Sequence, residues 1–565
     1  MLDVVSRSQR GRVCEYAKDG SSVTTPFAVT SEGSAPIWIE RTEIGRVMHV
    51  MGTDVPLEKG LLKTSSSGKV TDIHTYGSIA VVRLPLPETL EFEDEVDMVV
   101  VPNAFELRKD PRRTIDVIMR LREACGFNRI LCMLGIGEPS TVALLSYMGV
   151  DLFDDSLSIA SGRNGIRLIP EAEIVTGNDE IATNIEALNS ELEKIRIFVG
   201  ADRLRELADQ RAPSYPTNVA MLRLYDEIGY QYAEETCSVI GCRFSCNTTQ
   251  ALRRPDLKRY RARMKNYRKP ANKRVLVLLP CSAKKPYHIS KSHKAFASAI
   301  HTAQHDTLVH EVIVTSPLGA VPRELDAMYP ANSYDIPVTG EWKMEEKKMI
   351  REMIGDIISQ GYDKIICHLG DDYELVEGLA DMICTVVDGD TTSSASLSNL
   401  DKTLREVTKE MEPVGYLEDR NNQLRNILEY QFGKDAADIL MDSNTYAIGK
   451  FPYWKLIREN PENRSEKVQL GMTTPERGGM LSLTLDGAKI MADHGFSVVD
   501  VQPFELKGNL FAVGVNKADP GIRIGDEAVI VCDGVVKGVG VALMCGREMT
   551  DLKRGIAVKV RHKSK

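Results

Sequence analysis

One cysteine lies among many cationic side chains in residues 278–293, which read LLPCSAKKPYHISKSH. Cys281 directly follows an apolar run, and four lysines, two histidines and a tyrosine occur among the thirteen residues after it. The thiolate is the reactive form of cysteine, and nearby cations lower the pKa of a thiol. The pattern therefore predicts a reactive thiolate, although a cysteine after a strand is more often a small buried hydrophobe.

The strands and helices around this loop predict that it lies at an edge of a sheet where ligands bind. Three short apolar runs, 275–279, 311–316 and 364–370, are separated by helix-like segments, which predicts an α/β domain with buried parallel strands. Cys281 would then follow a strand at the carboxyl end of the sheet, where open α/β folds place ligands. The thiol is expected in a pocket, either as a nucleophile or as part of its lining.

Length and composition limit the class of protein. A chain of 565 residues is long enough for about three to five domains. The net charge is −9, so an anionic partner must be bound by local basic patches. The sequence has no secretory signal and no uncharged apolar run of about 18 residues, and its eleven cysteines are thinly spread. We expect a cytoplasmic protein with reduced thiols.

The rest of the chain changes character several times. Apolar runs near 97–104 and 129–137 alternate with helical patterns, which predicts βα units in the N-terminal part. Residues 388–399 are polar and rich in serine, which is typical of a linker. From Met480 onward, short strands alternate with glycine and aspartate turns, which predicts a small β-barrel.

A basic stretch precedes the cysteine loop. Residues 251–274 contain eleven lysines and arginines and a single aspartate. Such a run contacts phosphates in many RNA-binding proteins, or else forms a solvated helix face. Because the protein as a whole is acidic, we favour contact with RNA.

The C-terminal pattern resembles a PUA domain, a small barrel that binds structured RNA. The resemblance covers about 80 residues and rests on Pro520-Gly521, Gly525-Asp526, Gly538, Gly540 and the stretch 554–558. It implies an RNA partner.

The N-terminal part resembles archaeal tRNA-guanine transglycosylases. Residues 133–168 are similar to the stretch that carries the catalytic aspartate of that family, and Asp151 takes the place of the nucleophile. The base-recognition motif of the family is absent. Cys237, Cys242 and Cys246 depart from the zinc-knuckle spacing, so reduced structural cysteines are favoured over a zinc site and no cofactor is expected.

The cysteine loop is similar to the signature of archaeosine synthases, which are transglycosylase paralogues. Pro280-Cys281, Lys285-Pro286-Tyr287, Ser290 and His293 match that signature without a mismatch. The resemblance implies a transferase that adds nitrogen to the nitrile of 7-cyano-7-deazaguanine at position 15 of tRNA. It also implies lysine, glutamine or ammonia as donor, a radical-SAM partner enzyme and, from transglycosylase relatives, a homodimer.

These residues suggest covalent catalysis at the nitrile. Cys281 would add to the nitrile carbon and give a thioimidate, with Lys285 or His293 donating the proton. Tyr287 and Ser290 would donate hydrogen bonds to the imidate nitrogen, each worth about 3 kcal/mol by analogy with oxyanion donors.

Polar residues after the second strand of this domain are candidates for binding the amine donor. Arg323 would hold a carboxylate by a bidentate fork, and Glu324 would hold an amino group. Turn and helix-cap roles are an equal alternative. The other candidates in these loops are Thr315, Ser316, Asp335 and Glu341.

The predicted architecture is multidomain α/β plus β. It comprises a degenerate TIM-like barrel (1–236), a basic connector (237–274), a three-layer α/β catalytic domain (275–400), a small α+β connector (401–484) and a PUA barrel (485–565). Two other functions compete with nitrile modification, namely base exchange by Asp151 and a non-catalytic role in presenting tRNA. Asp151 would otherwise pack the barrel or contact the base.

Overall fold

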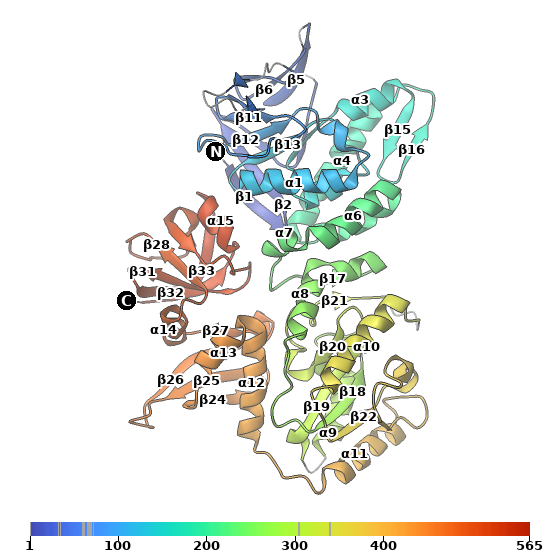
Figure 1. Cartoon of the computed structure of the whole chain (residues 1–565), viewed down its shortest axis with the longest axis vertical. Helices are drawn as coiled ribbons and strands as arrows, with labels where there is room; N and C mark the ends of the chain where they lie inside the picture. Colours follow the sequence, from blue (N-terminus) through green and yellow to red (C-terminus); the bar gives the residue numbers. More distant parts are fainter. Residues whose placement is uncertain are drawn as a thin grey trace. The chain divides into compact units, whose positions relative to one another are not determined.

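The computed structural model describes residues 2–31, 33, 35–43, 45–58, 63–64, 70–71, 73–302, 305–337 and 341–564 (Figure 1). Residues 338–340 of the candidate donor loop lie outside these ranges. The chain forms two compact units, the first from 1–238, 509–524 and 543–558, the second from 239–508, 525–542 and 559–565. Among the described helices, none is both long and apolar enough to span a membrane.

The first unit is built on a six-stranded sheet in the order β10-β11-β12-β13-β14-β4. Its strands are β4 (Phe27–Val29), β10 (Ile73–Tyr76), β11 (Ile79–Val82), β12 (Met98–Val101), β13 (Ile130–Met133) and β14 (Leu152–Asp154). All neighbours are parallel except β10 and β11. The predicted strands near 97–104 and 129–137 are β12 and β13, which confirms the prediction of parallel βα units there.

The two faces of this sheet pack against different partners. Val99 and Leu131 belong to a core shared with helices such as α1 (Pro111–Cys125). Val100 and Cys132 belong to a core shared with antiparallel strands. Those strands are β1 (Leu2–Ser8), β2 (Gly11–Lys18), β3 (Ser21–Thr24), β5 (Ile37–Thr42), β6 (Gly45–Val50) and β7 (Thr53–Pro56). The remaining helices are α2 (Val142–Tyr147), α3 (Ser156–Arg163), α4 (Ile181–Gly200), α5 (Leu204–Arg211), α6 (Pro216–Ile228) and α7 (Tyr230–Glu235).

The second unit contains a five-stranded sheet in the order β20-β19-β18-β22-β23. Its strands are β18 (Val275–Pro280), β19 (Val309–Thr315), β20 (Gly319–Pro322), β22 (Lys364–Cys367) and β23 (Ile383–Cys384). β18 lies between β19 and β22, and the three are parallel. The three apolar runs of the sequence are these three strands, so the predicted α/β domain is confirmed.

Alternate residues of β18 point to opposite faces of the sheet, as the pleat requires. Val275, Val277 and Leu279 pack with α9 (Lys291–His301) and α11 (Ser394–Thr408). Leu276 and Leu278 belong to the core that contains α8 (Pro255–Met264) and α10 (Met344–Ile358). A strand that is buried on both faces holds the loop after it firmly.

The predicted linker at 388–399 is wrong. Asp388 accepts hydrogen bonds from Ser393 and Ser396, and Ser393 caps the first turn of α11. The polar composition of this stretch therefore reflects capping chemistry at a helix start. Because α11 spans 394–408, the predicted domain boundary at 400 falls inside a helix.

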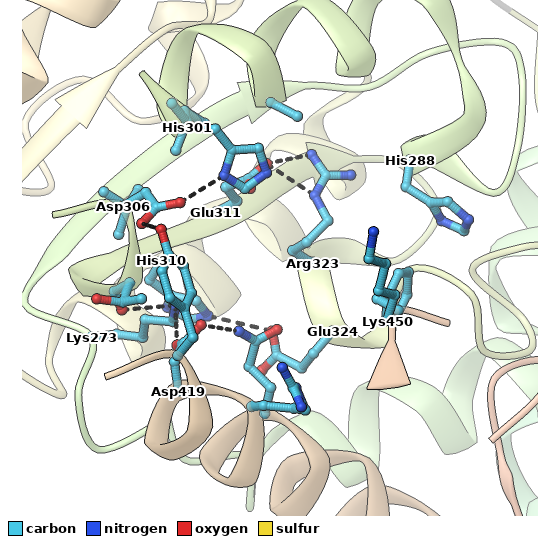
Figure 2. A pocket seen from close by; sticks show the side chains of 18 of the residues that line it. Lys273, His288, His301, Asp306, His310, Glu311, Arg323, Glu324, Asp419 and Lys450 are labelled. Atoms are coloured by element: carbon cyan, nitrogen blue, oxygen red, sulfur yellow. Dashed lines mark hydrogen bonds and ion pairs between the residues drawn. The ribbon is translucent and has the colours of Figure 1, made fainter. Parts of the chain in front are cut away.

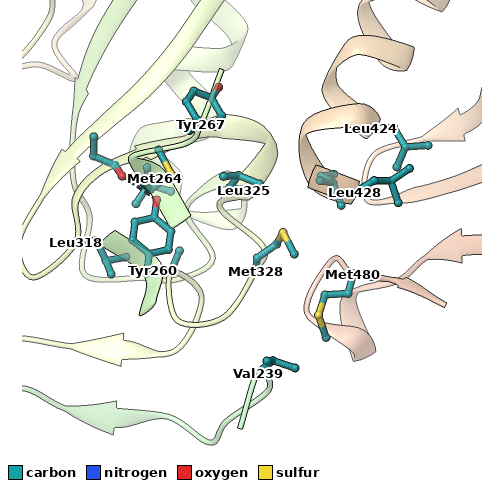
Figure 3. Packing of buried hydrophobic residues seen from close by; sticks show 14 of the residues in the cluster. Val239, Tyr260, Met264, Tyr267, Leu318, Leu325, Met328, Leu424, Leu428 and Met480 are labelled. Atoms are coloured by element: carbon teal, nitrogen blue, oxygen red, sulfur yellow. Dashed lines mark hydrogen bonds between the residues drawn. The ribbon is translucent and has the colours of Figure 1, made fainter. Parts of the chain in front are cut away.

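The core of the second unit extends beyond that boundary (Figure 3). Tyr260 and Met264 of α8 share a buried cluster with Leu424 and Leu428 of α12 (Tyr416–Phe432) and with Met480. The connector contains, besides α12, α13 (Lys434–Leu440), β24 (Thr445–Lys450), β25 (Tyr453–Glu459), β26 (Lys467–Thr473) and β27 (Leu481–Leu483), and α14 (Leu485–Asp493) follows it. It packs against the α/β sheet domain as one body.

The C-terminal region forms a six-stranded sheet in the order β29-β33-β32-β31-β28-β30. Its strands are β28 (Val498–Val501), β29 (Leu510–Phe511), β30 (Val515–Ala518), β31 (Glu527–Cys532), β32 (Val535–Ala542) and β33 (Ile556–Lys563), and α15 is Gly546–Asp551. The prediction of a small β domain with short strands is confirmed.

Candidate active site

Cys281 is the first residue after β18, the central strand of the five-stranded sheet. It lies at the carboxyl edge, where β19 also ends, at Thr315. Its side chain is partly exposed, and Thr315 hydrogen-bonds with the thiol. The predicted placement of the cysteine in a loop at this edge is confirmed.

Lys285 and three hydroxyl groups surround the thiol. The Nζ atom of Lys285 lies 4.1 Å from the ring centroid of Tyr334 and 5.8 Å from that of Tyr287. The Tyr287 hydroxyl donates to Thr315 Oγ1 at 3.2 Å and also hydrogen-bonds with the Tyr334 hydroxyl. The structure therefore brings Cys281, Lys285 and Tyr287 together, as the motif suggested.

Tyr334 is a residue that sequence reasoning missed. It belongs to β21 (Tyr334–Asp335), which pairs with β17 (Phe244–Ser245) outside the main sheet. Its hydroxyl also hydrogen-bonds with Thr315 at 2.5 Å. The tyrosine lies far from the motif in sequence and in a two-residue strand, so no local pattern marked it.

The predicted lowering of the Cys281 pKa is wrong. Burial raises the pKa of the thiol, and Asp372 raises it further, which outweighs the opposite effect of Lys285. Burial also lowers the pKa of Lys285, against the effect of Cys281. Burial thus disfavours the charged forms of both groups, the thiolate and the ammonium.

Ser290 and His293 form the start of α9. The Ser290 hydroxyl accepts a hydrogen bond from the His293 backbone N–H at 3.2 Å and acts as the N-cap. Arg323 Nη2 lies 2.9 Å from His293 Nδ1. Burial and the Arg323 charge lower the pKa of His293 to about 3, so the imidazole is neutral at pH 7. The ring centroid of His293 lies 5.2 Å from that of Tyr287, so His293 supports Tyr287 by packing against its ring.

Arg323 and Glu324, the candidate donor-binding pair, are engaged inside the protein. Arg323 donates to Glu311 Oε2 at 2.6 and 2.9 Å and to Asp326 Oδ2 at 3.2 Å. Glu324 Oε1 accepts from the Tyr267 hydroxyl at 2.7 Å and from the Asn426 amide at 2.9 Å. The guanidinium and the carboxyl group thus already have hydrogen-bonding partners.

A pocket with a volume of about 820 Å³ lies beside these residues (Figure 2). His293, Arg323 and Glu324 line it, together with His288. The His288 Nδ1 atom lies 2.8 Å from Asp326 Oδ1, and Asp326 is fully buried. Cys281 and Lys285 are not among the residues that line this pocket, whereas His293 is. The residues of the motif therefore lie in two different places.

Asp151, in the first unit, is buried and paired. Its carboxylate accepts from Arg12 at 2.9 and 3.0 Å, from Arg122, and from the Leu131 backbone N–H at 2.9 Å. Burial opposes ionisation, but the two arginines lower the pKa of this carboxyl group. Asp151 is therefore held as a buried ion, 2 % exposed, with its lone pairs occupied.

Cys237 and Cys246 are buried, and Cys242 is exposed. Across the described ranges, no three or more His, Cys, Asp or Glu side chains are arranged to hold a metal ion.

The basic run 251–274 is mostly committed to internal contacts. Arg254 pairs with Asp256, Lys273 pairs with Asp419, and both cations are buried. Others donate to backbone carbonyl groups, as Arg261 does to Pro317. The preference for a phosphate-binding face was therefore wrong for these side chains, because much of the run belongs to α8 and packs into the core.

Two stretches of the chain match known family models. Residues 257–404 match a family model described as a domain of unknown function (DUF5591). Residues 501–563 match the PUA domain model, inside the predicted range 485–565, so the PUA prediction is confirmed.

Three similar proteins span most of the chain. The archaeosine synthase subunit alpha of Thermoplasma acidophilum is 31% identical over 82% of this chain and 88% of its own length. The archaeosine synthase of Haloferax volcanii is 30% identical over 99% of both chains. The tRNA-guanine(15) transglycosylase of Methanobrevibacter smithii is 23% identical over 87% of this chain and 72% of its own. On this similarity, which includes the cysteine loop, the chain belongs to the archaeosine synthase family.

Proposed function

We propose that this protein is a tRNA-modifying transferase of archaeosine biosynthesis that adds a nitrogen nucleophile to the nitrile of 7-cyano-7-deazaguanine at position 15 of tRNA. The family and the PUA domain support the substrate class. The observation that carries the chemistry is the electrostatic interaction between Cys281 and Lys285 at the carboxyl edge of the sheet.

The pair performs nitrile addition in two proton transfers. Lys285, as a neutral amine, takes the proton of the Cys281 thiol while sulfur forms a bond to the nitrile carbon. One π bond of the nitrile opens onto nitrogen, and the ammonium of Lys285 returns the proton to that nitrogen. The product is a neutral thioimidate. No external proton is needed in this step.

The amine donor then attacks the carbon of the thioimidate. A tetrahedral adduct forms, its C–S bond breaks, and the sulfur leaves as a thiolate that regains a proton from the attacking amine through Lys285. The result is an amidine on the RNA and a free thiol. This assigns proton transfer to Lys285, because His293 is neutral and engaged with Arg323.

The hydroxyl cluster would stabilise the charge that develops on nitrogen. Tyr287, Tyr334 and Thr315 already share hydrogen bonds beside the thiol. A donor placed on the developing anion contributes about 3 kcal/mol in comparable sites. Ser290 caps the N-terminus of α9 and supports the cysteine loop through that helix.

Further parts of the proposal come from the family resemblance. The six-stranded sheet would derive from a shortened TIM-like barrel, and the α/β domain would be a three-layer catalytic domain. A radical-SAM partner and a homodimer are proposed on the same ground, with lysine, glutamine or ammonia as donor.

Base exchange by Asp151 is disfavoured by its two arginine partners, because a nucleophile needs an exposed lone pair. A purely RNA-presenting role predicts instead that Cys281 is dispensable.

A trapping experiment tests the covalent step. Purified protein is mixed with tRNA that carries the nitrile base, without any amine, and the products are separated under denaturing conditions. We expect a protein–RNA adduct that is absent from Cys281→Ala and present in Cys384→Ala, a control cysteine exposed on β23. Adding lysine, glutamine or ammonium should release RNA with the mass of the matching amidine. Normal conversion by Cys281→Ala would refute covalent catalysis.

A further inference from the structure

The pocket in the second unit offers a binding site that the chemistry at Cys281 does not use (Figure 2). Its walls come from α9, β19, the first turns of α12 and the turn between β24 and β25. A volume of about 820 Å³ is in the range of pockets for ligands the size of a nucleotide.

The buried wall of the pocket is polar. Glu324 and His310 both line it and are 2 % and 1 % exposed. The Tyr267 hydroxyl connects them, at 2.7 Å from Glu324 Oε1 and 3.0 Å from His310 Nε2. Burial raises the pKa of Glu324, and burial with the Lys273 charge lowers the pKa of His310. Burial therefore favours the uncharged form of both side chains.

The other interior charges cancel in pairs. Lys273 Nζ lies 2.6 Å from Asp419 Oδ1, and Arg323 Nη2 lies 2.6 Å from Glu311 Oε2. A ligand ammonium would find no unpaired carboxylate at these positions. Neutral groups that donate and accept hydrogen bonds suit the polar edge of a heterocycle.

Aromatic rings form another wall of the pocket. The ring of Phe451 is 5.3 Å from that of Trp454 and 5.1 Å from that of His288, measured between centroids. All three residues line the pocket. Aromatic side chains of this kind stack on nucleobases.

The rim is cationic. Lys294 and Lys450 line the pocket and are exposed, and neither has a carboxylate partner in the part of the chain that the structure describes. The tight turn after β24 presents Lys450 and Phe451 together. Gly449, near the end of β24, has φ at +104°, and an added Cβ there would clash with the Tyr453 carbonyl oxygen. Two exposed ammonium groups are suited to a phosphate.

We propose that this pocket binds a nucleoside monophosphate group, with its base against Phe451, Trp454 and the buried polar wall, and its phosphate at Lys294 and Lys450. The group is either one unpaired nucleotide of the bound RNA or a free nucleotide. The site is separate from the thiol chemistry and stands on its own observations.

Calorimetric titration with AMP, GMP, CMP and UMP tests the site. All titrations use Cys281→Ala protein, so the result does not depend on catalysis. We expect saturable binding to at least one nucleotide, and at least tenfold weaker binding after Phe451→Ala or the double change Lys294→Ala and Lys450→Ala. Lys455→Ala, an exposed lysine of β25 outside the pocket lining, is the control and should bind normally. The corresponding nucleoside, which lacks the phosphate, should bind at least tenfold more weakly.

Competition with tRNA identifies the source of the nucleotide. If the RNA supplies it, the bound monophosphate displaces tRNA, and the pocket variants bind tRNA more weakly than Lys455→Ala. If it is a free nucleotide, tRNA affinity is the same in all variants. Absence of nucleotide binding at millimolar concentration, with unchanged tRNA affinity in folded variants, overturns the proposal. So does lysine binding at this pocket in place of nucleotides. Neither result affects adduct formation at Cys281.

Discussion

Cys281 and Lys285 each favour the charged form of the other, in a half-buried place where burial disfavours both charges. Burial raises the pKa of the thiol while Lys285 lowers it, and burial lowers the pKa of Lys285 while Cys281 raises it. The net shift is upward for the thiol, whose ordinary pKa is 9.0, and downward for the amine, whose ordinary pKa is 10.5, because the surroundings disfavour both ions. A proton can then pass between sulfur and nitrogen at little cost, which nitrile addition requires.

Replacing Lys285 should remove this proton transfer. We expect Lys285→Met to slow thioimidate formation by about 10²- to 10⁴-fold, the usual range for loss of a general acid–base group. Lys285→Arg should not restore the rate, because a guanidinium does not lose its proton at working pH. The measurement is single-turnover adduct formation. Lys284→Met, an exposed neighbour, serves as control, and an active Lys285→Met protein would contradict the mechanism.

Asp372 should set the pH dependence of the reaction. Its charge raises the pKa of Cys281, and its carboxylate accepts a hydrogen bond from Trp342 Nε1 at 2.8 Å. The pair must lose one proton to react, so the rate should rise with pH. Asp372→Asn should move that rise to lower pH, because it removes a negative charge that opposes thiolate formation. The exposed Asp371→Asn is the control, and identical profiles for wild type and Asp372→Asn would refute this assignment.

His293 should make the fold sensitive to mild acid. Its pKa is about 3 in the folded protein against 6.5 ordinarily, so between these values the unfolded chain binds more protons. Stability is therefore lost as the pH falls below 6.5, by about 2 kcal/mol between pH 7 and pH 5. His293→Asn should remove this part of the pH dependence in urea unfolding.

His301 provides a control of opposite sign. Its hydrogen bond to Asp306 raises the pKa of the imidazole, so its contribution is present at low pH and lost as the pH rises. His301→Gln should therefore steepen the acid loss of stability, whereas His293→Asn makes it shallower. Equal slopes in wild type and His293→Asn would contradict the buried neutral imidazole.

Asp151 should matter for stability and not for chemistry. Asp151→Asn leaves Arg12 and Arg122 without their buried partner, which costs about 3–5 kcal/mol in comparable pairs. Because the folded pKa is lowered, the contribution of Asp151 is present at neutral pH and is lost as the pH falls below the ordinary value of 3.8. Urea unfolding measures the loss, with the exposed Asp116→Asn as control. Base exchange that disappears only in Asp151→Asn would reverse this conclusion.

The sequence by itself determined the local helices and strands and the side chains that are available for chemistry. The runs that became β18, β19 and β22 were recognisable because a strand buried on both faces needs consecutive apolar residues. The cysteine loop and the C-terminal PUA domain were recognisable for a related reason. Their residues lie close together along the chain, so their spacing is visible without knowledge of the fold.

Only the tertiary structure decided what these residues experience. The sign of the pKa shift of Cys281 depends on burial and on Asp372, and the state of His293 depends on Arg323. Tyr334 lies at the site although it belongs to a two-residue strand that is far from the motif in sequence. Desolvation and Coulomb energies depend on distances in space, which chain spacing does not fix. For the same reason the sequence did not reveal that Arg254 and Lys273 of the basic run have carboxylate partners inside the protein.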